Sequence, residues 1–159
     1  MTISESPGET IGASGIGLGE VSVAALRTAM AAGTLTSAEL VRYYLERIER
    51  LNPARGAVIS VSEDAVEQAS AVDQARATGA DLGPLAGIPV LIKDNISVAG
   101  SPATAGSPAL LGAAADDAFL IGRLRAASAV ILGKANLSEW ANFRSTQSSS
   151  GWSTLAGRP

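Results

Sequence analysis

Lys93 is the residue of this sequence whose type and position point most clearly to chemistry. It directly follows an unbroken apolar run from Ile88 to Ile92 and precedes Asp94. Such runs are typical of strands covered on both faces, and sites in α/β sheets assemble at strand ends. Burial there would disfavour the ammonium form, and a neutral lysine can act as a base. The competing interpretation is a lysine that pairs with Asp94 or extends from the sheet edge into solvent.

The absence of two residue types narrows the chemistry further. The 159 residues include no histidine and no cysteine. The lack of cysteine excludes disulfides, thiolate metal sites, iron–sulfur clusters and a cysteine nucleophile. The lack of histidine excludes a Ser-His-Asp relay, histidine metal ligands and an imidazole base. Acid–base chemistry in this sequence therefore has to use Lys, Asp, Glu, Tyr or an activated Ser or Thr.

A second lysine, Lys134, invites comparison with a phosphate-binding loop, because Gly133 and Lys134 follow another apolar run. That loop requires a glycine where this sequence has Ser128, and a serine or threonine where it has Ala135. The comparison therefore fails. We predict that Lys134 is a solvated lysine at a turn.

Two further motifs have low specificity. The glycines between Gly15 and Gly19 superficially match a dinucleotide fingerprint, but no strand precedes them and Glu20 takes the place of the third glycine. We predict a flexible tail over residues 1–20. Serines crowd the far end of the sequence, where a solvated loop or linker is predicted, because only Lys93 could serve as a base for them. These serines are Ser145, Ser148, Ser149, Ser150 and Ser153.

Composition limits the class of protein. Apolar types make up 47% and charged types 17%, so the chain can bury a core. A net charge of −3 is too small and of the wrong sign for nucleic-acid binding. No leader pattern is visible, and no apolar stretch approaches the ~18 residues of a membrane helix. We therefore expect a cytoplasmic protein of about one domain that binds neither nucleic acid nor membrane.

The elements that must position Lys93 alternate between helices and apolar strands, which favours an α/β fold. Thr36 and Glu39 form a capping box at the start of an amphipathic helix that we expect to end at Asn52 and Pro53. Strands covered on both faces need neighbours, and this chain supplies few, so the predicted sheet is incomplete. The sequence further predicts helices over 23–32, 62–79 and 116–127, strands over 57–61, 88–92 and 130–132, and a short helix capped by Asn136.

The residues from Gly83 to Asn95, which contain Lys93, form a pattern that resembles the entry motif of the amidase signature family. The resemblance covers about residues 21–159, and the blocks around Lys93 and over 133–145 are specific. The last of the similar segments look closest to the peptide-amidase-like branch. Besides the entry motif, the similar segments are 21–51, 104–107, the helix at Asp117, 129–140, 141–145 and 149–153.

The resemblance implies an amide hydrolase that uses a Ser–cisSer–Lys triad. In the family, the lysine that matches Lys93 is neutral at rest and relays protons through a serine held by a cis peptide bond. That serine activates a second serine, which attacks the amide carbonyl and forms an acyl-enzyme. Both serines lie in Gly/Ser-rich segments beyond Ser153 in the family pattern, so this chain carries only the lysine, and Ser148 to Ser150 do not replace them. The resemblance implies no cofactor or metal, and a chain inactive alone.

The expected fold is accordingly the N-terminal portion of an amidase domain over residues 21–159, with a mixed central sheet covered by helices. Its expected partners are a small-molecule or peptide amide and either the remainder of the domain or a complementing chain. Two alternatives stay open: a non-catalytic α/β module that binds a partner, and a subunit related to the glutaminase of tRNA-dependent amidotransferases. The pattern of Trp140, Phe143 and Trp152 favours the peptide-amidase-like branch over the second alternative.

Overall fold

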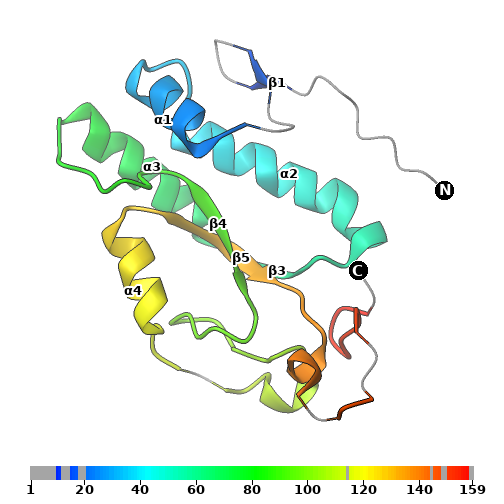
Figure 1. The fold of residues 1–159 in the computed structure, drawn as a ribbon. Helices are drawn as coiled ribbons and strands as arrows, with labels where there is room; N and C mark the ends of the chain where they lie inside the picture. The colour runs from blue at the N-terminus through cyan, green and yellow to red at the C-terminus, as the bar shows by residue number, and fades with distance from the viewer. Residues whose placement is uncertain are drawn as a thin grey trace.

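The elements of the protein surround a small mixed sheet (Figure 1). The structure, a computed structural model, describes residues 10–11, 15–17, 21–113, 115–143, 145–147 and 150–157. The helices are α1 (Val23–Ala31), α2 (Ser37–Arg55), α3 (Ala65–Ala77) and α4 (Phe119–Ala126), with 3-10 turns η1 (Pro108–Leu110) and η2 (Glu139–Asn142). The strands are β1 (Thr10–Ile11), β2 (Ile16–Gly17), β3 (Val58–Val61), β4 (Pro89–Lys93) and β5 (Val130–Ala135).

The central sheet has the order β3-β5-β4. Strand β5 pairs antiparallel with β3 and parallel with β4, so the predicted mixed sheet is confirmed. The central strand β5 is buried along its length except at Ala135, as its apolar sequence predicts. In the parallel ladder Ile92 is level with Lys134 and Lys93 is level with Ala135, so both lysines lie at the same end of the sheet.

Helices cover both faces of this sheet. Figure 1 shows α2 and α3 on one side of the strands and α4 on the other. On the first face, α2 and α3 pack against Val130 and Leu132 of β5 through small and β-branched side chains. On the second face, Ile121 of α4 packs against Ile131 and Ile92. Side chains alternate between the two faces of a strand, so β5 contributes to both cores.

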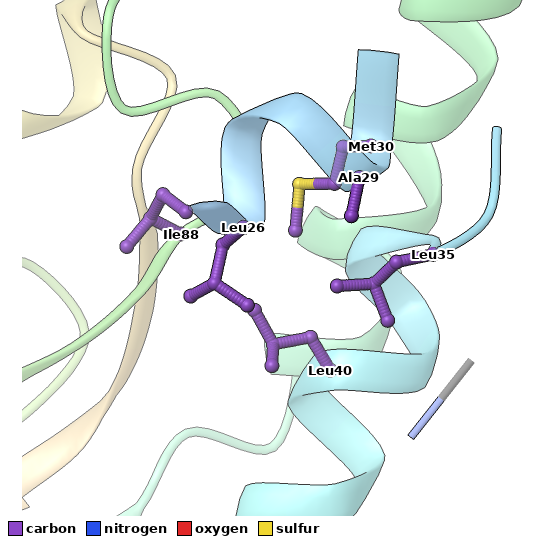
Figure 2. Close-up of a cluster of buried hydrophobic side chains, with 6 residues drawn as sticks. All are labelled: Leu26, Ala29, Met30, Leu35, Leu40 and Ile88. Atoms are coloured by element: carbon purple, nitrogen blue, oxygen red, sulfur yellow. The ribbon is translucent and has the colours of Figure 1, made fainter. Parts of the chain in front are cut away.

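A third cluster of buried side chains holds the start of β4 in place (Figure 2). Ile88, the residue before β4, packs among apolar side chains of α1, of the turn after it and of the first part of α2. This packing anchors the strand that ends at Lys93 to the helical layer. The members of the cluster are Leu26, Ala29, Met30, Leu35, Leu40 and Ile88.

Strand β4 departs from the prediction that it is covered on both faces. Only Ile92 is buried within the strand, whereas Leu91 and Lys93 are exposed. Its one neighbour among the described strands is β5, because β4 lies at the edge of the sheet. The position of Pro89 at the first residue of this edge strand agrees with the missing backbone donor of proline.

Helix α2 begins at the predicted capping box but does not end at Asn52 and Pro53 as expected. It continues to Arg55 and ends at Gly56, which adopts the left-handed conformation at φ 56° and donates its N–H to Asn52 O at 2.7 Å. Pro53 lacks one backbone donor, and a single lost bond near the helix end is tolerated. In the part of the chain that the structure describes, no helix is both long and apolar enough to span a membrane.

Three predicted helix starts, at residues 62, 116 and 136, differ from the structure. Asp117 does not cap α4; its carboxylate instead accepts hydrogen bonds from Ala99 N–H and from Arg125, both at 2.8 Å. The Ser62 hydroxyl bonds Asp64 at 2.6 Å rather than a helix N–H. Asn136 precedes a kinked turn, and its side chain donates to Gly56 O and accepts from the Ser153 hydroxyl. Side chains of this type can bond distant backbone and side-chain groups instead of capping a helix.

The predicted N-terminal tail is described only in part. Thr10–Ile11 and Ile16–Gly17 pair as a short antiparallel ladder, and Ile11 and Ile16 pack against the cluster of Figure 2. The remaining residues of the tail lie outside the described residues. The boundary between residues 20 and 21 therefore stays a prediction.

Candidate active site at the end of strand β4

Lys93 is the last residue of β4, as the apolar run before it predicted. Its side chain is exposed, so the burial that the sequence predicted around this amine is not present in this structure. Alternation along the strand places Lys93 on the same face as Leu91. Asp94, the partner considered for it from sequence, forms its ion pair with Lys134 instead. Among the described residues, no carboxylate pairs with the Lys93 amine.

The prediction that Lys134 is a solvated lysine at a turn is wrong. Strand β5 continues through Gly133 to Ala135, and the Lys134 side chain is only 2% exposed. Its Nζ lies 3.2 Å from Asp94 Oδ1 and donates hydrogen bonds to Ile96 O at 2.8 Å and Pro102 O at 3.3 Å. The loop that follows β4 folds over this lysine, and local sequence carries no information about that burial.

Asp94 is held as firmly as Lys134, and it is 1% exposed. Its second carboxylate oxygen accepts a hydrogen bond from the Thr104 hydroxyl. Its backbone N–H donates to Ala135 O at 3.0 Å, and its backbone carbonyl accepts from Ala105 N–H at 3.1 Å. The residue after Lys93 is therefore tied to β5 and to the loop over 104–106.

The segment after Thr104 packs against the serine-rich end of the chain. Gly106 adopts φ +75°, and a Cβ added there would lie 2.7 Å from the Ser153 Cβ, so only glycine fits. Ser153 is 1% exposed and donates to Asn136 Oδ1 at 2.9 Å. The prediction of a solvated loop is therefore wrong for Ser153, which is a packed structural residue.

Two other serines of that cluster lie on the surface. Ser145 and Ser150 are exposed, and the Ser150 hydroxyl accepts a hydrogen bond from the Asn142 amide at 2.7 Å. Ser148 and Ser149 lie outside the described residues. Among the described serines, none has a hydroxyl bonded to the Lys93 amine.

A groove lies on the face of β4 that carries Leu91, and Lys93 is not among the residues that line it. Its volume is 240 Å³, and it runs between the second half of α2 and the strands. Burial raises the pKa of the Tyr44 hydroxyl in its wall, and the nearby Arg47 partly opposes that effect. The apolar residues lining the groove are Tyr44, Ile48, Leu51, Val58, Leu91 and Leu132.

The two lysines at this end of the sheet have opposite environments. Lys93 has the exposed amine, on a backbone fixed from both sides by buried Ile92 and Asp94. Lys134 has the buried amine. The sequence analysis did not predict that Lys134, Asp94 and Thr104 form a buried polar cluster at this end of the sheet. The signal that could have found it is that two apolar runs each end in a lysine, at positions that parallel pairing brings together.

Comparison with known proteins identifies the family. The profile of the family described as Amidase matches residues 39–155. A probable amidase of Arabidopsis thaliana is 46% identical over 138 residues, which cover 84% of this chain. A glutamyl-tRNA(Gln) amidotransferase subunit of Symbiobacterium thermophilum is 42% identical over 132 residues, 81% of this chain. The crystal structure of the native peptide amidase of Stenotrophomonas maltophilia superimposes on 88% of the chain with a TM-score of 0.84 and 49% identity.

This chain belongs to the amidase family, and its fold corresponds to one portion of the amidase fold. It spans 27% of the length of the Arabidopsis and Symbiobacterium relatives and 29% of the peptide amidase chain. The family resemblance seen in the sequence is therefore confirmed. The coverage also agrees with the incomplete sheet, in which edge strand β4 has a single described neighbour.

Proposed function

We propose that this chain is the lysine-bearing portion of an amide hydrolase, with Lys93 as the proton carrier. The observation that carries the proposal is the place of Lys93: the last residue of an edge strand, exposed, and without an ion-pair partner among the described residues. The neighbouring carboxylate, Asp94, is engaged elsewhere. An amine so placed is available to hydroxyl groups that another segment brings to it.

In the proposed reaction, the segment that brings the serines also covers Lys93, and this burial favours its neutral amine. The amine then accepts a proton from a bridging serine, which in turn takes the proton of the nucleophilic serine. The nucleophile attacks the amide carbonyl, and the carbon–nitrogen bond breaks as the relay returns the proton to the leaving nitrogen. Ammonia or an amine leaves and an acyl-enzyme forms. Water, deprotonated through the same relay, then attacks the ester and releases the acid.

Both serines and the backbone donors of an oxyanion hole would come from outside this chain, from the remainder of the domain or from a complementing chain. An oxyanion-hole donor alone is worth about 10²–10³ in rate. We therefore propose that residues 1–159 by themselves do not turn over amides. Release of ammonia from amides by this polypeptide alone, at enzyme-like rates, would contradict that assignment.

A chimera tests the role of Lys93. This chain replaces the matching portion of the Stenotrophomonas peptide amidase, and hydrolysis of a peptide amide is followed by product release. We expect Lys93→Ala to lower kcat by at least about 10²-fold, the usual contribution of a positioned general base. Arg123→Ala, which removes an exposed positive charge on α4, is the matched control and should stay within about twofold. Unchanged hydrolysis in the Lys93→Ala chimera would remove this residue from the mechanism.

The second candidate function is that of a subunit in a tRNA-dependent amidotransferase. The observation in its favour is the 42% identity to the Symbiobacterium amidotransferase subunit, close to the 46% identity to the Arabidopsis amidase. The two candidates share the lysine chemistry and differ in partner. In the chimera, hydrolysis of a simple peptide amide supports the first candidate. In a second chimera, this chain replaces the matching portion of the Symbiobacterium subunit. Hydrolysis of glutamine by this second chimera and not by the first, and only with the other amidotransferase subunits present, supports the second candidate.

The non-catalytic module remains the outcome in which neither chimera shows activity. It would then bind a partner through the exposed edge of β4, where backbone groups lack a described neighbour. A folded chimera of either type with no hydrolysis of any amide would favour this alternative.

A further inference from the structure

Lys93 and Lys134 are the two lysines of the whole chain, and the fold brings them to the same end of one sheet. Ile92 is level with Lys134 in the parallel ladder, so the two lysines lie on adjacent strands, one residue out of step. Their environments are opposite: Lys93 is exposed and Lys134 is 2% exposed. The proposed function uses Lys93 and leaves Lys134 without a role.

The Lys134 ammonium connects three separate points of the loop that follows β4. It pairs with Asp94 at 3.2 Å and donates to Ile96 O at 2.8 Å and to Pro102 O at 3.3 Å. Asp94 in turn accepts the Thr104 hydroxyl. The Lys134–Asp94 pair therefore bonds several points of this loop at once. The loop begins at Asp94, the residue after Lys93.

A buried ion pair is a weak source of stability, because the cost of taking both charges out of water offsets their attraction. Apolar side chains of similar volume could fill the same space. What the pair supplies, and apolar residues cannot, is directional bonds. These bonds tie Asp94, Ile96 and Pro102 together. The backbone of Lys93 is held between this cluster and buried Ile92, and its carbonyl accepts the Ile96 N–H at 2.9 Å.

We propose that Lys134 is a positioning residue for Lys93, acting through Asp94. It holds the end of β4 so that the Lys93 side chain leaves the sheet in one direction. It also keeps the Asp94 carboxylate engaged, so that this carboxylate does not pair with the Lys93 amine. The proposal rests on the proposed role of Lys93 and adds to it the means by which the amine stays available.

The test measures the Lys93 amine directly and needs no turnover. The chain is treated with trinitrobenzenesulfonate over a range of pH, and mass spectrometry reports the modification of each lysine. In the unsubstituted chain we expect Lys93 to react at least ten times faster than Lys134, since Lys134 is buried and bonded. Equal rates in the folded chain would overturn the proposal.

Substitution of Lys134 by Met releases Asp94 from its partner. We expect the pH midpoint of Lys93 labelling to rise by about one unit in Lys134→Met, since a nearby free carboxylate favours the ammonium form. It should return to the parent value in Lys134→Met combined with Asp94→Asn, which lacks that carboxylate. A role confined to stability would not predict this rescue. A midpoint unchanged in the folded Lys134→Met chain would overturn the proposal.

A second variant keeps the proposal testable where Lys134→Met does not fold. Asp94→Asn retains an oxygen for the Thr104 hydroxyl, and it removes the negative charge and the oxygen that faces Lys134. We expect hydrogen exchange of the Ile96 and Ala105 amides, which bond the Lys93 and Asp94 carbonyls, to become at least tenfold faster. Exchange equal to that of the parent would overturn the proposal.

Failure of the positioning role of Lys134 can be distinguished from failure of the proposed catalytic role of Lys93. Labelling and exchange report the geometry of Lys93 whether or not it takes part in hydrolysis. The Lys93→Ala chimera reports catalysis whether or not Lys134 positions the amine.

Discussion

We predict that, among the polar residues of the helical layer that covers the sheet, replacement of Asp73 lowers the free energy of unfolding the most. Its two carboxylate oxygens accept the backbone N–H groups of Ser37 and Ala38, at 2.9 and 3.0 Å, in the first turn of α2. Arg76 donates to the same carboxylate at 2.8 Å and to Ala86 O at 3.1 Å, just before β4. One carboxylate on α3 therefore caps another helix and orients the turn that leads to the site strand.

The magnitude follows from the contacts that Asp73→Ala would break. Hydrogen bonds to a charged group contribute about 1.5–3 kcal/mol each, and Ser37 and Ala38 are buried, so water does not replace the lost acceptor. We expect Asp73→Ala to lower the free energy of unfolding by about 3–5 kcal/mol. Asp73→Asn keeps one oxygen and should cost roughly half as much. Loss of the negative charge at a helix N-terminus adds in the same direction.

Urea unfolding followed by far-UV circular dichroism measures this cost, with the m-value checked for constancy. Thr36→Ala is the matched control, because it removes the local capping-box bond of the same helix, between Thr36 Oγ1 and Glu39 N at 3.1 Å. Its expected cost is about 1 kcal/mol. If Asp73→Ala costs no more than Thr36→Ala, the long-range cap carries little energy and our reasoning about α2 is wrong.

Two further predictions concern other parts of the fold. Gly133→Ala should destabilise by more than about 2 kcal/mol, because the new Cβ would lie 2.2 Å from Ser60 O at a backbone φ of +155°. Gly122→Ala on α4, where nothing lies within 4 Å, should instead stabilise by roughly 0.5–1 kcal/mol, and thermal unfolding compares the two. The Ser62 hydroxyl, assisted by other hydrogen bonds, lowers the pKa of Asp64, so Ser62→Ala should raise it in an NMR titration. This stabilisation is present above the ordinary aspartate pKa and is lost as pH falls through the folded value; an unmoved midpoint would contradict it.

The sequence predicted helix starts and strand ends correctly where the interactions that set them join residues close together in the chain. The capping box joins Thr36 and Glu39 three residues apart, and the structure contains it. The apolar run before Lys93 predicted a strand that ends at that residue, which is confirmed. The end of α2 was misjudged because Asn52 bonds both backbone groups of Val58 in a turn that closes only after Gly56.

The end of the sheet shows why the rest could not be predicted. Lys134 follows a glycine after an apolar run, which is typical of a solvated turn. It is buried because Asp94, Ile96 and Pro102, between 32 and 40 positions earlier in the chain, fold over it. Likewise Ser153 is packed because Gly106 lies against it.

The amino-acid sequence by itself determined the types of the main helices and of the three central strands, the position of Lys93 at a strand end, and membership of the amidase family. Each of these follows from patterns within a few residues or from shared motifs. Only the tertiary structure decided the strand order β3-β5-β4, and which of the two lysines is exposed and which is paired with Asp94. Burial and ion pairing depend on segments far apart in the chain, and the free energy of placing a charge is set by what surrounds it in space.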